Sequence, residues 1–265
     1  MTEDISAVRL EMESRPEAPA LVRAALTGVA QRLDLDPELF DDLKTAVSEA
    51  CNNVVLYAYN GQPGPLAVAL DLGPEGMAAT IRDWGRGIGP VEASEERMGV
   101  GLAVISALAD RAEFISAPDG GTEVRMAFAG GSGATGALER VPVQLSGDVV
   151  VTVWPVSLLT GVLGRITRAV AGRTHLSVDR FSDIYLVTDA IAGLAGSAAG
   201  APGVTFAVTG SHQRLELVVG PFRAGNGERL LADGLLDQSP VLSECAIESV
   251  EGFEFLRVVL EERGD

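Results

Sequence analysis

Lysine is almost absent from this 265-residue sequence, and cysteine, histidine and aromatic residues are scarce. The one lysine, Lys44, lies outside any glycine-rich loop, which excludes a P-loop because that loop needs a lysine after its last glycine. Cys51 and Cys245 lack the spacing of a zinc site, and His175 and His212 stand alone in the sequence. A metal cluster or a Ser-His-Asp site is therefore not expected.

Positive charge is also in short supply. Asp and Glu number 37 against 20 Lys and Arg, a formal net charge of −17. Nucleic-acid affinity comes mostly from clustered Lys and Arg, so we expect no nucleic-acid partner, whereas an acidic surface suits a basic protein partner. With no signal peptide, no apolar run of membrane length and few cysteines, we expect no membrane association and a reducing, cytoplasmic location.

Length and composition suit two globular domains. The 265 residues exceed what most single cores need and fit two domains of about 130 residues. The stretch 130–136, GGSGATG, is small, flexible and the most linker-like segment of the chain. We predict a first domain over residues 1–129, a linker over 130–140 and a second domain over 141–265.

The stretch from Asp42 to Asn60 is expected to be the central helix of the first half. Its apolar residues recur at three- and four-residue intervals, as in a helix with one face in the core. Glu49 and Asn53 are four residues apart on one face, roughly a quarter turn from the middle of the apolar stripe. Taken alone, the pair could equally be the ordinary polar edge of a buried helix. The motifs that follow favour the rim of a site.

Three glycine motifs follow this helix in order. A strand-like run ends in a D-x-G-x-G pattern, a G-x-G-L pattern opens the next helix, and a G-T pair precedes the last strand of the first half. The candidate site residues that these motifs contribute are Asp83, Gly85, Gly87, Gly99, Gly101 and Thr122.

Hydrophobic patterning predicts the elements around these motifs. For the first half we expect strands over residues 5–12, 66–72, 77–83, 111–117 and 122–129, and helices over residues 18–33, 36–60 and 99–110. Helices gathered on one face of a mixed sheet would make an α/β (α+β) two-layer sandwich.

The order of E-x-x-x-N on a helix, D-x-G-x-G, G-x-G-L and G-T resembles the ATP site of the GHKL, or Bergerat-fold, superfamily. The stretches GLAVISALAD and GTEVRMAF are most similar to anti-sigma factor serine kinases of the RsbW and SpoIIAB type. The resemblance covers residues 5–129. It implies a Bergerat-type ATP-binding fold, ATP and Mg²⁺ as cofactors, and a sigma factor or an anti-sigma factor antagonist protein as partner.

The resemblance also implies roles for individual residues. Asp83 would accept a hydrogen bond from the exocyclic amine of adenine, and Gly85 and Gly87 would let the backbone approach the base without a Cβ clash. Asn53 would offer its amide oxygen to Mg²⁺, which prefers a few protein oxygens beside phosphates and waters. Glu49, one turn earlier, would take the proton of a hydroxyl or a water that attacks the γ-phosphate.

Two further roles concern the phosphates and the base. Gly99 and Gly101 at a helix start would present free N–H groups and the positive end of the helix dipole to the phosphates. Thr122 would support Asp83 or a water near the base.

The second half looks like a degenerate copy of the same fold. Strands are expected over 149–153, 204–208, 215–219 and 253–260, and helices over 158–171 and 181–199, in the order found in the first half. Gly220, Ala224 and Phe253 stand where the first half has Asp83, Gly87 and Thr122, and Asp189 and Gly193 fall near the positions of Glu49 and Asn53. The nucleotide residues are lost there. The alternative is an unrelated α/β domain with a similar order of elements.

Three functions fit these observations. The first is an anti-sigma-type serine/threonine protein kinase that regulates transcription, and the second is an ATP-gated protein-binding module that transfers no phosphoryl group. The catalytic half of a histidine kinase is disfavoured because the interval from Asp83 to Gly99 is too short for a large lid and no acceptor histidine lies in a dimerisation helix. We also expect the second half to act as an intramolecular partner of the first, in a pseudo-dimer with one working site; the alternative is two independent domains joined by a flexible tether.

Overall fold

The computed structural model describes residues 6–33, 35–73, 76–87, 96–129, 145–231 and 241–262. Contacts divide the chain into two units, Met1–Leu26 with Leu33–Leu138, and Thr27–Arg32 with Glu139–Asp265. The expected linker over 130–136 lies outside the described residues, and the domain boundaries stay a prediction.

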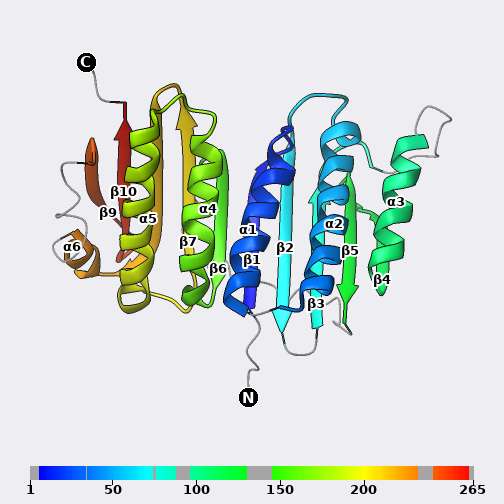
Figure 1. The fold of residues 1–265 in the computed structure, drawn as a ribbon, viewed down its shortest axis with the longest axis horizontal. Coiled ribbons are helices and arrows are strands. Elements are labelled where there is room, and N and C mark those ends of the chain that lie inside the picture. The colour runs from blue at the N-terminus through cyan, green and yellow to red at the C-terminus, as the bar shows by residue number, and fades with distance from the viewer. Residues whose placement is uncertain are drawn as a thin grey trace. The chain divides into compact units, whose positions relative to one another are not determined.

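Among its described residues, the first part of the chain forms five strands and three helices (Figure 1). In order they are β1 (Ser6–Glu13), α1 (Ala18–Leu33), α2 (Pro37–Asn53), β2 (Pro65–Gly73), β3 (Gly76–Asp83), α3 (Glu96–Leu108), β4 (Arg111–Ser116) and β5 (Thr122–Phe128), with a π-helical turn η1 (Val54–Ala58) after α2. The strand order is β4-β5-β3-β2-β1. All four pairs are antiparallel, so the expectation of a mixed sheet was wrong. Helix α3 lies between β3 and β4 in the sequence. These two strands are not neighbours, because β5 lies between them in the sheet and pairs antiparallel with both.

The core of this unit follows from the alternation of side chains along each strand. Val8 and Leu10 of β1 pair with Leu70 and Val68 of β2, and all four are completely buried. In Figure 1 the helices of this unit cover one face of its sheet. The fold class is the expected α/β two-layer arrangement, with an antiparallel sheet.

The antiparallel register brings the predicted motifs to one end of the sheet. Asp83, the last residue of β3, is opposite Leu66 of β2, and its neighbour Arg82 is opposite Glu123 of β5. Asp83 is therefore beside Thr122, the residue at which β5 begins.

The second unit contains the same kinds of element in the same order. They are β6 (Val149–Trp154), a short 3₁₀ turn η3 (Val156–Leu158), α4 (Leu159–Ala171), α5 (Val178–Ala198), β7 (Val204–Ser211), β8 (Arg214–Arg223), α6 (Asn226–Leu230), β9 (Glu244–Val250) and β10 (Phe253–Glu261). The strand order is β6-β7-β8-β10-β9, again with every pair antiparallel. Each strand thus has a counterpart at the same place in the order of the first sheet. Among the described residues no helix is both long and apolar enough to cross a bilayer.

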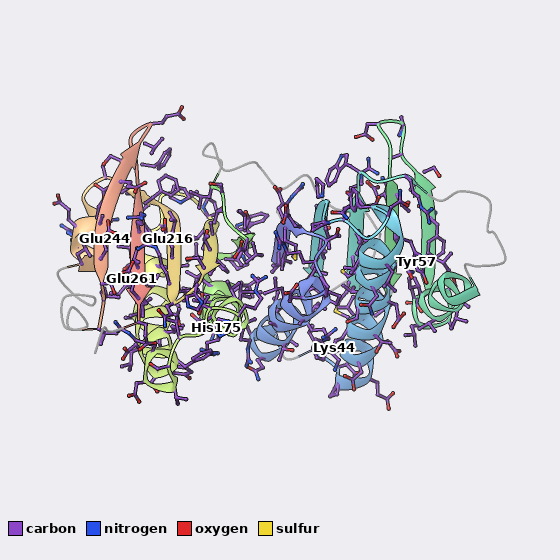
Figure 2. The ribbon with its side chains drawn as sticks, turned by 90° about the horizontal axis from the view of Figure 1, so that it is seen from above. Lys44, Tyr57, His175, Glu216, Glu244 and Glu261 are labelled. Carbon is purple, nitrogen blue, oxygen red and sulfur yellow. The ribbon has the colours of Figure 1, made fainter. Side chains whose placement is uncertain are left out.

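The sheet of the second unit carries a ladder of paired charges, in which Figure 2 labels Glu216, Glu244 and Glu261. Arg257 donates to Glu216 at 2.8 Å and to Glu244 at 2.7 Å, and Arg214 pairs with Glu261. These partners lower the pKa of Glu216, chiefly through its hydrogen bond with Arg257. The ladder is satisfied within itself, and the acidic residues in it are not free to hold a cation.

Candidate functional site

Helix α2 positions Glu49 and Asn53. Its start is set by Asp36, whose carboxylate accepts the N–H groups of Glu38 and Leu39 at 3.1 and 3.0 Å, with Pro37 at the first helical position. The inner face of the helix is buried, whereas Glu49 and Asn53 are only partly so. The pair therefore lies at the margin of the core, as its spacing indicated.

Asn53 lies against Gly101 of α3. A Cβ on Gly101 would lie 3.1 Å from both Oδ1 and Nδ2 of Asn53, so a larger residue would press on the amide. The Nδ2 atom of Asn53 is buried and has no hydrogen-bond partner among the described residues. A buried amide without a partner is costly, and a ligand that bonded to it would remove that cost.

Helix α3 begins at Glu96, three residues before Gly99. Gly101 is consequently the sixth residue of the helix, beyond the first turn whose N–H groups are free. The close approach of Gly101 to Asn53 is a reason that a glycine suits this position, and the phosphate-binding role of Gly101 stays a prediction. Gly99 lies in the first turn, where an N–H can be free.

Asp83 is the buried acid of the site, with 3% of its surface exposed. Its Oδ1 accepts the N–H of Gly85 at 2.8 Å, and Thr122 donates both its N–H and its hydroxyl to the same carboxylate. Burial is the largest influence and raises the pKa of Asp83, opposed by these hydrogen bonds and by Arg82. The result is a carboxylate held rigidly at a strand end, with lone pairs left for a further donor.

Three glycines make this corner possible. A Cβ on Gly85 would be 2.2 Å from the carbonyl oxygen of Ala58, and one on Gly121 would be 2.1 Å from that of Asp83. Gly87 has φ +76°, a left-handed conformation that favours glycine. The contact of Gly85 with Ala58 ties the end of β3 to η1, the turn that directly follows Asn53, so the two halves of the predicted site meet there.

Tyr59 is a site residue that the sequence did not reveal. Its hydroxyl donates to the carbonyl of Pro65 at 2.5 Å and accepts the N–H of Trp84 at 2.8 Å. It thereby links the start of β2 to the residue after Asp83. The need for a glycine at position 121 was likewise not predicted, although Gly121 directly precedes Thr122 in the G-T motif.

Other reactive groups lie outside this site. Burial raises the pKa of the Cys51 thiol to about 12, so it is not a nucleophile. His175 and His212, isolated in the sequence, come together in the second unit with ring centroids 5.2 Å apart. No group of three or more metal-binding side chains occurs among the residues that the structure describes.

The second unit has different side chains at the corresponding end of its sheet. Phe253 stands at the start of β10, where Thr122 starts β5, and Gly220 on β8 supplies no carboxylate. Instead Glu254, 8% exposed, accepts the N–H groups of Gly225 and Gly227 at 2.6 and 2.7 Å. The loop N–H groups of this unit are thus bonded to its own side chain.

The first half of the chain is similar in sequence to known proteins. The profile of the histidine kinase-like ATPase domain matches residues 12–128. An anti-sigma F factor of Caldanaerobacter subterraneus is 31% identical over 129 residues, which cover 45% of this chain and 90% of that protein. The serine-protein kinase RsbW of Bacillus cereus is 28% identical over 124 residues, 42% of this chain and 78% of the relative. A crystal structure of the RsbU and RsbW domains of a Mycobacterium tuberculosis protein aligns at 10% identity and a TM-score of 0.30, too low to support an argument. The chain belongs to the histidine kinase-like ATPase family, through its first half.

Proposed function

We propose that this protein binds ATP in its first unit and acts as an anti-sigma-type serine/threonine protein kinase. The observation that carries the proposal is the buried carboxylate of Asp83, held by Gly85 and Thr122 and joined through Ala58 to the helix that bears Asn53 and Glu49. The relatives named an anti-sigma F factor and a serine-protein kinase support the regulatory and the catalytic parts of the proposal.

The residues present suit a purine nucleotide. The carboxylate of Asp83 keeps lone pairs that can accept the adenine amine, and its burial strengthens that hydrogen bond by excluding water. Asn53, which directly precedes η1, lies against Gly101, and the missing Cβ of the glycine leaves space for the amide group. The Nδ2 atom of this amide has no hydrogen-bond partner among the described residues. Oδ1 of Asn53 would hold Mg²⁺ together with the phosphates, and the metal would neutralise charge on them.

Phosphoryl transfer would depend on Glu49. In the proposed reaction the hydroxyl oxygen of a serine or threonine on a partner protein bonds to the γ-phosphorus, the bond to the β–γ bridging oxygen breaks, and ADP leaves. Glu49 takes the hydroxyl proton. It lies one turn before Asn53 on the same face of α2, so the proton acceptor and the proposed metal ligand approach the phosphates from one side.

A comparison of two glutamates on one helix tests this proposal. Glu49→Gln should keep ATP affinity but reduce transfer of labelled phosphate to an antagonist protein by about 10²–10⁴-fold. Glu38→Gln, in the exposed first turn of α2, is the matched control and should leave both unchanged. If the wild type binds ATP and a sigma factor but labels no candidate protein, the chain is an ATP-gated binding module. Failure to bind ATP would reject both functions.

The partners and the role of the second unit are further parts of the proposal. A sigma factor or its antagonist is the proposed partner, in the cytoplasm. We propose that the second unit serves as an intramolecular partner of the first, because a short tether raises the effective concentration of two linked modules to roughly millimolar. Solution scattering tests this idea: a compact monomer supports it, and two independently tumbling units, or a dimer formed through the first unit alone, would reject it.

A further inference from the structure

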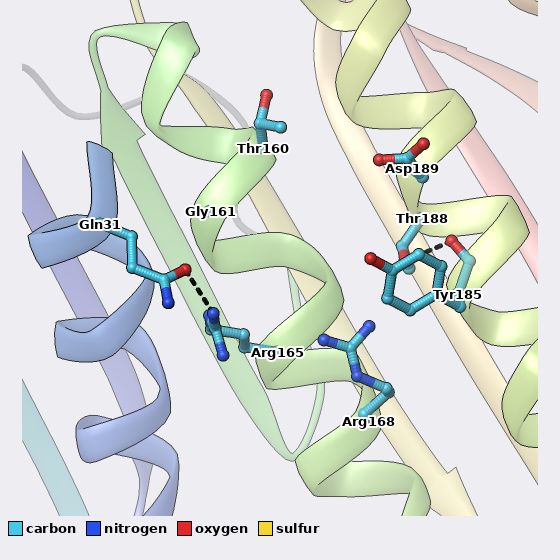
Figure 3. A pocket seen from close by; sticks show the side chains of 8 residues that line it. All are labelled: Gln31, Thr160, Gly161, Arg165, Arg168, Tyr185, Thr188 and Asp189. Carbon is cyan, nitrogen blue, oxygen red and sulfur yellow. Dashed lines mark hydrogen bonds between the residues drawn. The ribbon is translucent and has the colours of Figure 1, made fainter.

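The helical layer of the second unit contains a polar pocket of about 230 Å³ that the proposed kinase activity does not use (Figure 3). It lies on α4 and α5, and Gln31, which the contacts group with this unit, also borders it. The residues that line it include Arg165, Arg168, Tyr185, Thr188 and Asp189.

Two of these residues are arginines that have no carboxylate partner among the described residues. Arg165 donates to the amide oxygen of Gln31 at 2.5 Å, and the guanidinium of Arg168 stacks over the ring of Tyr185 at 5.0 Å from its centroid. The protein has a net charge of −17, and most of the other arginines that the structure describes lie beside a glutamate or an aspartate, so two such guanidinium groups at one pocket are unusual. Only one carboxylate, the exposed Asp189, borders the pocket against them.

The position of Arg168 depends on a glycine. A Cβ on Gly164 would lie 3.0 Å from both Nη1 of Arg168 and Oγ1 of Thr188, so the guanidinium occupies the space that a side chain would take. Burial lowers the pKa of Arg168, and the positive charge of Arg165 acts in the same direction, which means that the charged form is held at a cost. An anion in the pocket would lower that cost.

We infer that this pocket binds the phosphoryl group of a phosphomonoester or of free phosphate. The guanidinium of Arg168 suits an oxyanion because it presents several N–H donors to the oxygens. Arg165, which Figure 3 shows turned toward Gln31, adds a second positive charge at the border of the pocket. The hydroxyl of Tyr185 is a further donor at the edge of the same space, as Figure 3 shows. The inference concerns only residues of the second unit and does not depend on the proposed kinase activity.

The direct test is titration of the full-length protein with inorganic phosphate, O-phosphoserine and a phosphoserine peptide, followed by the Nε–Hε NMR signals of its arginines. The signals of Arg165 and Arg168 should shift, and Arg168→Gln should weaken binding at least about tenfold, as expected for loss of a charge-assisted hydrogen bond. Arg223→Gln, at the exposed end of β8, is the control and should bind as the wild type does. Tighter binding of the peptide than of phosphate would identify a phosphorylated protein as the source; equal binding would identify the free ion.

A second pair of variants separates pocket geometry from stability. Gly164→Ala should weaken phosphate binding about as much as Arg168→Gln while leaving the fold intact, since alanine favours a helix over glycine. Gly193→Ala on α5, where a Cβ would meet nothing within 4 Å, should leave binding unchanged. Arginine signals that stay unmoved by all three probes, or equal affinity in Arg168→Gln and the wild type, would overturn the inference.

Discussion

The amide group of Asn53 lies against the backbone of Gly101, such that a Cβ on the glycine would be 3.1 Å from both amide atoms. This contact joins α2, which carries the E-x-x-x-N motif, to α3, which carries G-x-G-L. The small size of residue 101 therefore determines where the Asn53 amide can lie.

Gly101→Ala should accordingly weaken ATP binding without weakening the fold. Alanine improves helix propensity by about 1 kcal/mol relative to glycine, but its methyl group would displace the Asn53 amide by a few tenths of an ångström. We expect a loss of affinity of about tenfold in calorimetry and unchanged or higher resistance to urea. Ser106→Ala, on the exposed side of α3, is the control; equal affinities for both variants would disprove the role of Gly101.

Asp83→Asn should weaken ATP binding by about 10- to 100-fold, because the amide replaces an acceptor with a donor. The wild type should also lose affinity as the pH falls, because burial raises the pKa of Asp83 and the protonated acid is a poorer acceptor for the adenine amine. The variant has no such proton to gain. The ratio of wild-type to Asp83→Asn affinity for ATP, measured from pH 8 downward, should therefore decrease as the pH falls. A constant ratio would mean that an ionised Asp83 does not accept the adenine amine.

Tyr59→Phe should affect both stability and nucleotide binding. The change removes the hydroxyl that links Pro65 to Trp84 and leaves the N–H of Trp84 without that acceptor, a loss of about 1 kcal/mol in the free energy of unfolding. ATP affinity should fall as well, because Trp84 follows Asp83 directly. Tyr57→Phe, in the same turn, is the matched control. A Tyr59→Phe protein with lower stability and normal ATP affinity would restrict the hydroxyl to a structural role.

Asp71→Asn should stabilise the protein above neutral pH. Burial raises the pKa of Asp71 to about 6, and its Oδ2 has no hydrogen-bond partner among the described residues. Since the folded pKa is above the unfolded one, ionisation costs stability as the pH rises from about 4 through 6, and this cost is absent below the unfolded pKa. We expect a gain of about 1 kcal/mol at pH 8, allowing for partial solvent screening, and almost none near pH 4. Urea unfolding at both pH values measures the difference.

Local patterns predicted most of the fold. Helix α1 has the bounds expected from its apolar spacing, Ala18–Leu33, and β3 and β5 begin and end within a residue or so of the expected positions. Strand β9 was missed because it lies at a sheet edge and none of its residues is fully buried, so it carries no alternation to detect. The helix expected to run to Asn60 changes to the π-turn η1 after Asn53, a change in backbone hydrogen bonding that apolar spacing does not encode.

The site was only partly accessible to sequence reasoning. Asp83, Gly85 and Thr122 were predicted together and are in contact, since motif order brings strand ends together once the register is antiparallel. The link from Tyr59 to Trp84 and the meeting of His175 with His212 arise from tertiary structure between distant segments, and neither has a local signal. The length of α3 was also hidden, because its first turn has no apolar stripe that could mark a start at Glu96.

The carboxylate of Glu254 has a thermodynamic consequence for the whole chain. Glu254 already accepts the N–H groups of Gly225 and Gly227, so the second unit satisfies these donors when it folds. In the first unit, the buried Nδ2 of Asn53 has no partner among the described residues. A ligand that binds only the folded form raises the free energy of unfolding by mass action, by about 2.7 kcal/mol at a hundredfold excess over Kd, and the melting temperature rises with it. ATP should therefore shift the melting of the first unit alone, and a scanning calorimetry trace that is symmetric without ligand should separate into an early and a late component as ATP is added.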